Sequence, residues 1–279
     1  MTAPLTQYGL PLPAAEERDG TAVYGDNFDA AQIAIWFGNE QQGFYQLAET
    51  LYQPAEGEDF ESLASDTYHF YRHLGARQFD LCLALGCGDA QDVAQLAPRV
   101  GRFIAIEPAQ DWWRDEIGGR PASYRQPQPD GTLDLPDASV DLITVYSVLH
   151  HIPNVSRVLG ELARVLKPGG LVLLREPVVS MGDFTVPRFG LTAHERGIPS
   201  RVLETAFAHN GLVVRRRAFF RTNAFIKALT LIGLNANTRL AVQLDALVSR
   251  ILTFNLRYWR RHLLDRLSPS SAAYVLEKA

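Results

Sequence analysis

Cysteine and long hydrophobic runs are both scarce in this chain of 279 residues. The two cysteines, Cys82 and Cys87, are too few for a disulfide scaffold and are not spaced as Cys-x-x-Cys, so we expect no metal site built on them. No run reaches the roughly 18 apolar residues that a membrane span needs, and the N-terminal segment lacks the pattern of a signal peptide. We therefore expect a cytoplasmic protein.

An excess of positive charge is also missing. The formal net charge is −4, which disfavours general nucleic-acid binding because such proteins must neutralise many phosphates. With 47% hydrophobic and 21% charged residues, the composition excludes disorder and suffices for a sizeable core. We expect one elaborated domain that acts on a small molecule.

Apolar runs alternate with helical stretches from residue 77 onward, and this order predicts βαβ units around a parallel sheet. The predicted strands are 79–85, 102–107, 140–149, 170–177, 212–220 and 272–278. The predicted helices between them are 90–96, 112–117, 155–166 and 200–210. The main domain is therefore expected to span 77–279.

Two further regions flank or interrupt that domain. Residues 1–76 read as a surface arm followed by helices that cover the active site: two short ones within 27–52, and another at 60–74. A helical insert at 222–267 precedes the last strand, and its apolar positions fit a cap over the site or a homodimer contact. Its Arg-rich end, 257–267, fits either a solvated face or a peripheral contact with an anionic membrane.

The sharpest motif is LALGCGDAQD at 83–92, a buried strand that runs into a glycine turn. Gly86 and Gly88 allow a tight turn and a close approach of backbone to ligand, at the crevice where open α/β sheets bind ligands. Gln91 stands where a dinucleotide fingerprint needs glycine, so an NAD(P)-dependent oxidoreductase is disfavoured. Glu107, at the end of the next strand, can accept hydrogen bonds from ribose hydroxyls, and Trp112 can cover an adenine; a solvated carboxylate and ordinary packing are the alternatives.

Four segments in order carry a family resemblance: LALGCGDA, IAIEPA, LDLPDASVDLITVYSVLHHIPN and ELARVLKPGGLVLLREP. Together they cover 79–177 and resemble the class I S-adenosylmethionine-dependent methyltransferases, particularly the branch that methylates small molecules. The resemblance implies an α/β, Rossmann-like fold with a seven-stranded, mostly parallel sheet, an antiparallel last strand and helices on both faces. It also implies S-adenosylmethionine as the cofactor and S-adenosylhomocysteine as the product.

The resemblance also assigns cofactor-binding positions. They are Gly86, Cys87, Gly88, Asp89, Glu107, Pro108, Trp112, Asp130, Gly131, Tyr146 and Ser147. Two positions depart from the family pattern, because Ala84 replaces the usual acidic residue and Ala90 replaces the usual third glycine. Asp89 is the candidate to compensate.

Methyl transfer to a hydroxyl requires an aligned acceptor and a base that removes its proton. His150 and His151 end the predicted strand 140–149, and side-chain alternation should direct only one of them to the substrate. Glu176, on the next strand, can orient a histidine, and this doublet with its acid resembles sugar O-methyltransferases. The alternative is that both histidines pack against the following helix.

The segment 177–200 is longer than a plain connection, which is typical of a loop that selects the substrate. Its polar residues, suited to a hydroxylated or anionic acceptor, are Asp183, Arg188, His194 and Arg196. The segment also resembles methyltransferases found with bacterial surface-polysaccharide genes. We expect O-methylation of a small molecule, with a sugar or glycan acceptor first; the alternatives are N- or C-methylation of a natural product or quinone, and a non-catalytic protein with this fold.

Overall fold

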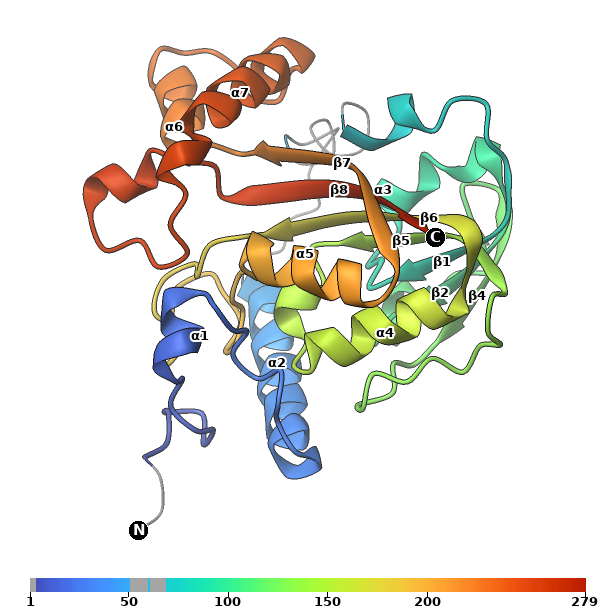
Figure 1. The fold of residues 1–279 in the computed structure, drawn as a ribbon, viewed down its shortest axis with the longest axis horizontal. Helices are drawn as coiled ribbons and strands as arrows, with labels where there is room; N and C mark the ends of the chain where they lie inside the picture. Colours follow the sequence, from blue (N-terminus) through green and yellow to red (C-terminus); the bar gives the residue numbers. More distant parts are fainter. Residues whose placement is uncertain (1–3, 51–59, 61–68) are drawn as a thin grey trace.

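The computed structural model describes residues 4–50, 60 and 69–279, and an eight-stranded sheet runs through its centre (Figure 1). The strand order is β3-β4-β2-β1-β5-β6-β8-β7. The strands are β1 Phe79–Leu85, β2 Val100–Ile106, β3 Glu116–Ile117, β4 Arg120–Arg125, β5 Val140–Tyr146, β6 Leu166–Pro177, β7 Leu212–Phe220 and β8 Ser271–Lys278.

The sheet confirms the predicted fold class. Strands β4, β2, β1, β5 and β6 are parallel, and β8 inserts antiparallel between β6 and β7. The eighth strand is the two-residue β3, which pairs antiparallel with β4. Gly118 and Gly119 both have positive φ, 56° and 77°, and they reverse the chain between these strands. The helix predicted at 112–117 is therefore wrong, because its end belongs to this hairpin.

Helices cover both faces of the sheet. The α-helices are α1 Ala15–Asp19, α2 Ala30–Thr50, α3 Gln91–Ala94, α4 Val155–Val165, α5 Ser200–His209, α6 Asn223–Leu231 and α7 Arg239–Leu252. The 3₁₀ turns are η2 Tyr71–His73, η3 Ala97–Arg99, η4 Gln110–Trp112, η5 Leu149–His151, η6 Thr253–Asn255 and η7 Leu263–Arg266. In α4, Val155, Val158, Leu159 and Leu162 follow helical spacing and are all buried in one core cluster with Leu83 of β1. Cys82 belongs to the cluster on the opposite face, as strand alternation requires.

Helix α2 is one continuous helix of 21 residues, so the prediction of two short helices in 27–52 is wrong. Gly38 faces open space, and a Cβ at Gly43 would lie 3.4 Å from Thr192 of the 177–200 segment. The two glycines therefore lower helix propensity, by roughly 1 kcal/mol each, without breaking the helix. Most of the helix predicted at 60–74 lies outside the described residues.

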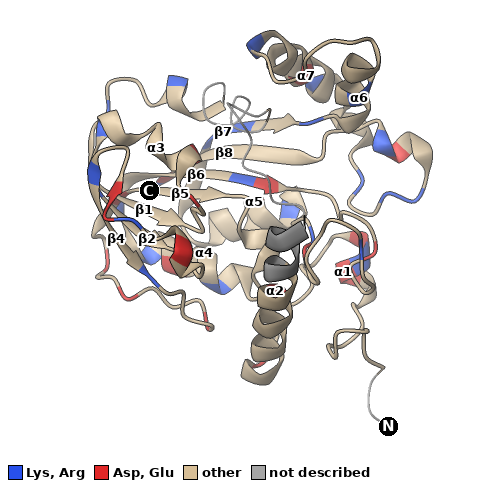
Figure 2. Ribbon diagram, turned by 180° about the vertical axis from the view of Figure 1, so that it is seen from behind, with Lys and Arg blue, Asp and Glu red and all other residues tan. Residues whose placement is uncertain are grey.

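The insert at 222–267 projects from the β7 edge of the sheet as the helix pair α6 and α7 followed by 253–267 (Figures 1 and 2). Helix α7 packs on β7 through Ala241, Val242, Asp245 and Ser249, which are buried. Within the described ranges, no helix combines the length and hydropathy required to cross a bilayer.

Candidate active site

The glycine turn joins β1 to α3 in a conformation that requires two of its glycines. Gly86 and Gly88 have φ values of 60° and 54°. A Cβ at Gly86 would lie 2.6 Å from Val148, and one at Gly88 would lie 3.2 Å from the Trp112 ring. The turn is therefore packed tightly between Val148 and η4, and the ring of Trp112 lies against it. That Trp112 covers a bound base stays a prediction.

Glu107 follows β2 and binds the glycine turn directly. One carboxylate oxygen accepts the backbone N–H of Gly88 at 2.9 Å, and the other accepts that of Ala109 at 2.9 Å. The side chain is buried, and burial raises its pKa against the opposing effect of these two bonds. A carboxylate can accept about four hydrogen bonds, so two remain for ribose hydroxyls. The residues of the turn thus fit S-adenosylmethionine.

Several other assigned cofactor positions line or support the same turn. Cys87 is half-buried, and its partial removal from water raises its thiol pKa to about 12. Asp89 accepts the N–H of Gln91 at 3.2 Å at the start of α3. Pro108 is exposed beside Glu107. Tyr146 closes the end of β5, with its ring stacked on Phe70 at 5.4 Å between centroids.

Sequence reasoning missed an ion pair beside this turn. Arg175 of β6 is buried and donates to Asp92 of α3 at 2.9 Å and to the Ser147 hydroxyl at 3.3 Å. Its guanidinium also lies 5.2 Å from the centre of the Tyr146 ring. Asp92 lines a small hollow of about 30 Å³ with Gly86 and Tyr146. Asp92 therefore places an acidic group on this hollow, whereas Asp89 accepts the N–H of Gln91 at the start of α3.

Asp130 and Gly131 lie apart from the contacts of the glycine turn. The Asp130 carboxylate accepts from Thr132 and, at 3.0 Å, from Arg157 of α4. A Cβ at Gly131 would lie 2.7 Å from Val158 of α4. Their contacts fix a loop to the start of α4, and their place beside the adenine stays a prediction.

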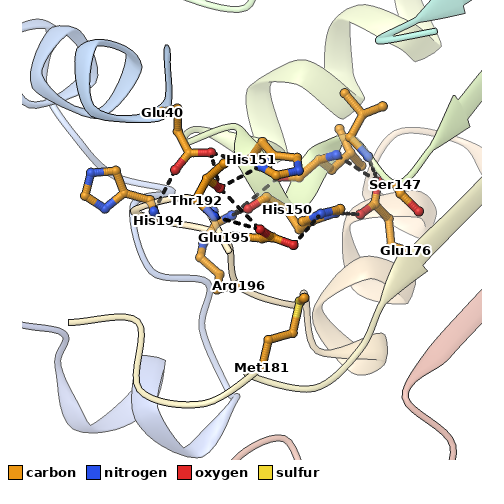
Figure 3. Close-up of polar contacts among 12 residues, drawn as sticks. Glu40, Ser147, His150, His151, Glu176, Met181, Thr192, His194, Glu195 and Arg196 are labelled. Atoms are coloured by element: carbon orange, nitrogen blue, oxygen red, sulfur yellow. Dashed lines mark hydrogen bonds and ion pairs between the residues drawn. The ribbon is translucent and has the colours of Figure 1, made fainter. Parts of the chain in front are cut away.

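His150 forms a buried pair with Glu176 (Figure 3). Its Nδ1 lies 2.8 Å from one Glu176 oxygen, and the other oxygen accepts the N–H groups of Val148 and Leu149 at 2.9 and 2.7 Å. Because a carboxylate only accepts, Nδ1 carries the proton and Nε2 of the neutral ring is an acceptor. Burial, with the charge of His151, lowers the pKa of His150 despite Glu176.

His151 is held by a different carboxylate, Glu40 of α2. Its Nδ1 lies 2.8 Å from Glu40, whose oxygens also accept the Thr192 hydroxyl at 2.8 Å and the N–H of His194 at 2.6 Å. Burial lowers the pKa of His151, but the hydrogen bond and charge of Glu40 outweigh it and raise the pKa. The Glu40 partnership was not predicted, because it lies 111 positions away in the sequence.

The two histidines lie together, contrary to the prediction that alternation separates them. Strand β5 ends at Tyr146, and the 3₁₀ turn η5 carries both rings, with centroids 4.1 Å apart. Glu195 joins them, with its Oε1 3.7 Å from Nε2 of His150. Within the described part of the chain, one ligand atom from each of these three residues lies within 4.8 Å of the others, a set that could hold a divalent cation.

The polar residues predicted to bind substrate mostly hold the 177–200 segment in place. Arg196 is fully buried and donates to the carbonyls of Tyr24, His150 and Ile152. His194 is buried and stacked on Trp36 at 4.4 Å. In this structure both side chains hold the segment in place, and their binding of the substrate stays a prediction.

The remaining two predicted substrate residues also engage the segment itself. Asp183 accepts the N–H and hydroxyl of Thr185, at 3.0 and 2.6 Å. Arg188 donates to the carbonyls of Met181 and Thr192. Glu195 and Thr192 of this segment lie beside the histidines, with Thr192 Oγ1 3.2 Å from Nδ1 of His151 (Figure 3).

Comparison with known proteins agrees with this architecture. Residues 83–174 match the model of a methyltransferase domain family. A probable S-adenosylmethionine-dependent methyltransferase of Mycolicibacterium smegmatis is 30% identical over 138 residues, which are 44% of this chain and 51% of that protein. A sterol 24-C-methyltransferase of Eremothecium gossypii is 26% identical over 222 residues, 64% of this chain and 59% of that one.

The chain spans about half the length of the curated relatives it matches first. Among solved structures, an S-adenosylmethionine-dependent methyltransferase from Archaeoglobus fulgidus has a TM-score of 0.53 at 13% identity, covering 84% of this chain and 99% of that one. The chain therefore has the fold of the class I S-adenosylmethionine-dependent methyltransferases, with a match to a methyltransferase domain at 83–174.

Proposed function

We propose that this protein transfers a methyl group from S-adenosylmethionine to a hydroxyl of a small molecule, with sugars and surface glycans as the first acceptors to test. The observation that carries the proposal is the His150–Glu176 pair, 2.8 Å apart. It gives a neutral imidazole whose Nε2 accepts a proton, at the carboxyl edge of the sheet where ligands of open α/β folds bind.

The cofactor supplies an activated methyl group, so the chain's own residues have to place the acceptor and take its proton. Glu176 fixes the ring of His150 and stabilises the imidazolium that forms when Nε2 takes the proton. Arg196 holds the carbonyl of His150 at 2.9 Å, which fixes the backbone of η5 from behind. Such a positioned base contributes about 10² to 10⁴ in rate.

At the cofactor end, we propose that Glu107 binds the ribose and that Asp92 takes over from the missing acid at Ala84. Asp92→Asn keeps the size of the side chain and removes the charge that Arg175 pairs with. We expect weaker binding of S-adenosylhomocysteine, measured by calorimetry, with Asp89→Asn as the matched control. Equal losses in the two variants would contradict the role of Asp92.

The test of the base is single-turnover methyl transfer by His150→Ala and Glu176→Gln over a panel of hydroxylated acceptors. We expect a rate loss of roughly 10² to 10⁴ for His150→Ala while S-adenosylhomocysteine still binds. His209→Ala, on the exposed end of α5, is the control. Undiminished turnover by His150→Ala would contradict the role of this histidine as the general base.

A C-methyltransferase is the second candidate, because one of the relatives is a sterol 24-C-methyltransferase. Amine and carbon acceptors on the same panel test that alternative. A non-catalytic protein would bind S-adenosylhomocysteine and transfer no methyl group to any of them.

Metal chelation separates two roles for the histidines. A cation bound by His150, His151 and Glu195 would occupy the Nε2 lone pair that a base needs. With His150 as the base, we expect the methyl-transfer rate to survive dialysis against EDTA. A rate that falls on chelation and returns with Zn²⁺ or Mg²⁺ would assign these residues to a metal centre instead.

A further inference from the structure

The outer face of the 222–267 insert is unusually apolar. Eleven of the eighteen large hydrophobic side chains exposed among the described residues lie within 231–267. On α7, Leu240, Leu244, Leu247 and Ile251 recur at helical spacing and are 41 to 65% exposed. The opposite face of α7 is the one buried against β7. The helix therefore presents a second apolar stripe outward.

The same insert is strongly basic within an acidic protein (Figure 2). Residues 222–267 contain seven Lys and Arg against two Asp, a formal charge of +5. Because the whole chain has a net charge of −4, the rest of the chain carries −9. Asp245 is buried, where it accepts the N–H groups of Arg221 and Thr222, so it does not offset the surface charge. Basic side chains around exposed leucines are typical of an interfacial membrane helix.

A cleft lies between this insert and the 177–200 segment. Its volume is about 350 Å³, and its walls are the segment 179–182, the start of α6, and the cations Lys227, Arg260 and Arg266. Among the described residues, none of these three cations makes an ion pair. Nε of Arg260 is buried without a hydrogen-bond acceptor, and its pKa is lowered by burial and by the charge of Arg266. An anionic group in the cleft would accept a hydrogen bond from this Nε and would raise the pKa of Arg260 by its negative charge.

One wall residue of the cleft points toward the proposed reacting groups. Met181 lines it, and Figure 3 shows the Met181 side chain extending toward the His150 and Glu195 cluster. Ser180, another wall residue, donates its N–H to Tyr258 of the insert at 2.8 Å. A molecule anchored by an anionic group in the cleft could thus extend along Met181 toward His150.

We propose that the 222–267 insert docks this protein on an anionic membrane and that the cleft receives the phosphate of a lipid-anchored acceptor. The second part rests on the proposed function, whereas the docking itself does not. A second copy of this chain is the less favourable occupant of the face, because a two-fold contact would set +5 against +5. A bilayer rich in anionic lipid matches both the charge and the leucine stripe.

The test is sedimentation of the full chain with vesicles of phosphatidylcholine alone or mixed with phosphatidylglycerol. We expect binding to the mixed vesicles only, and weaker binding at high salt because the charges are screened. Arg257→Gln with Arg261→Gln should lower the partition coefficient, roughly fivefold for each charge removed. Leu244→Ser with Leu247→Ser should also lower it.

Matched controls are Leu5→Ser, which alters an exposed leucine outside the insert, and Arg102→Gln, at the opposite end of the sheet. Both should bind vesicles like the wild type. A wild-type protein that stays in the supernatant with anionic vesicles would overturn the docking. A wild-type dimer in gel filtration that becomes a monomer in the double variant Leu244→Ser with Leu247→Ser would also overturn the docking. The leucine stripe would then be a contact between two copies of the protein.

The cleft is tested separately with inorganic pyrophosphate as the probe. We expect pyrophosphate to raise the melting temperature of the wild type but not that of Lys227→Gln with Arg266→Gln. Equal shifts in both proteins would remove the cleft from the proposal. Neither measurement depends on methyl transfer, so failure of the proposed activity and failure of the docking are distinguishable.

Discussion

Two adjacent histidines acquire opposite acid–base properties because each has its own carboxylate. The pKa of His150 is lowered by burial and by its neighbour, and that of His151 is raised because Glu40 outweighs burial. A general base must be neutral, so the activity should rise as pH passes upward through the pKa of whichever histidine acts.

The pH profile of kcat/KM therefore identifies the base. With His150 as the base, we expect the acidic limb of the profile to lie below pH 6.5, the ordinary histidine value. A limb above pH 6.5 that disappears in His151→Gln would assign the role to His151 instead. The profile of Glu40→Gln is the second readout. Loss of that carboxylate should lower the pKa of His151, and with less charge on His151 the His150 limb should move upward and not disappear.

At this scale the sequence indicated candidate residues, and their catalytic roles stay predictions. His150 and Glu176 were identifiable from motifs at the ends of successive strands, and the structure brings them to 2.8 Å. Glu40 carried no motif, since a lone acid inside a helix is ordinary. The sequence did not show that Arg196 and His194 are buried, because a charged residue in a loop is usually exposed.

At the scale of elements, Glu40 ties α2 to both η5 and the 177–200 segment. Three donors converge on its buried carboxylate, from His151, Thr192 and His194. Trp36, one turn earlier on α2, donates its ring N–H to the carbonyl of His151 at 2.7 Å. This N-terminal helix is thus fixed over the proposed acceptor site by polar contacts rather than by a continuous apolar face.

We expect Glu40→Ala to lower the free energy of unfolding by about 3 kcal/mol, because three buried donors lose their acceptor. Glu40→Gln should cost less, since its carbonyl oxygen still accepts from His194. Gln41→Ala, exposed on the same helix, is the control and should change stability by no more than about 0.5 kcal/mol. Urea unfolding of the three variants measures these differences. A loss in Glu40→Ala no larger than in Gln41→Ala would show that the contacts contribute nothing.

At the scale of the whole molecule, stability should depend on pH through His194. Asn39 donates one amide N–H to the carbonyl of Tyr8, so the same amide nitrogen faces Nε2 of His194, at 3.0 Å in each case. Nε2 must then accept, and a protonated ring would set donor against donor. Burial, partly opposed by the charge of Glu40, lowers the pKa of His194 to about 4.

The direction of this pH dependence follows from the pKa of histidine in the unfolded chain, about 6.5. Above pH 6.5 both states are neutral and the full stability is present, whereas between pH 6.5 and 4 only the unfolded chain takes the proton. We expect the free energy of unfolding to fall by roughly 3 kcal/mol over that range from this residue alone. His194→Gln should flatten the dependence in urea unfolding at several pH values, and His209→Gln should not. A wild-type slope that His194→Gln leaves unchanged would contradict this account.

The sequence by itself determined the fold class and the glycine turn, because those features are local: alternating apolar runs, and glycines between a strand and a helix. S-adenosylmethionine was implied by the resemblance of four segments to a methyltransferase family. The sequence also indicated His150, His151 and Glu176. Only the tertiary structure decided which carboxylate each histidine meets, that Arg196 is buried, and that α7 has an apolar stripe on its outer face. Burial and long-range pairing depend on how elements far apart in the chain pack together, and no local pattern records that packing.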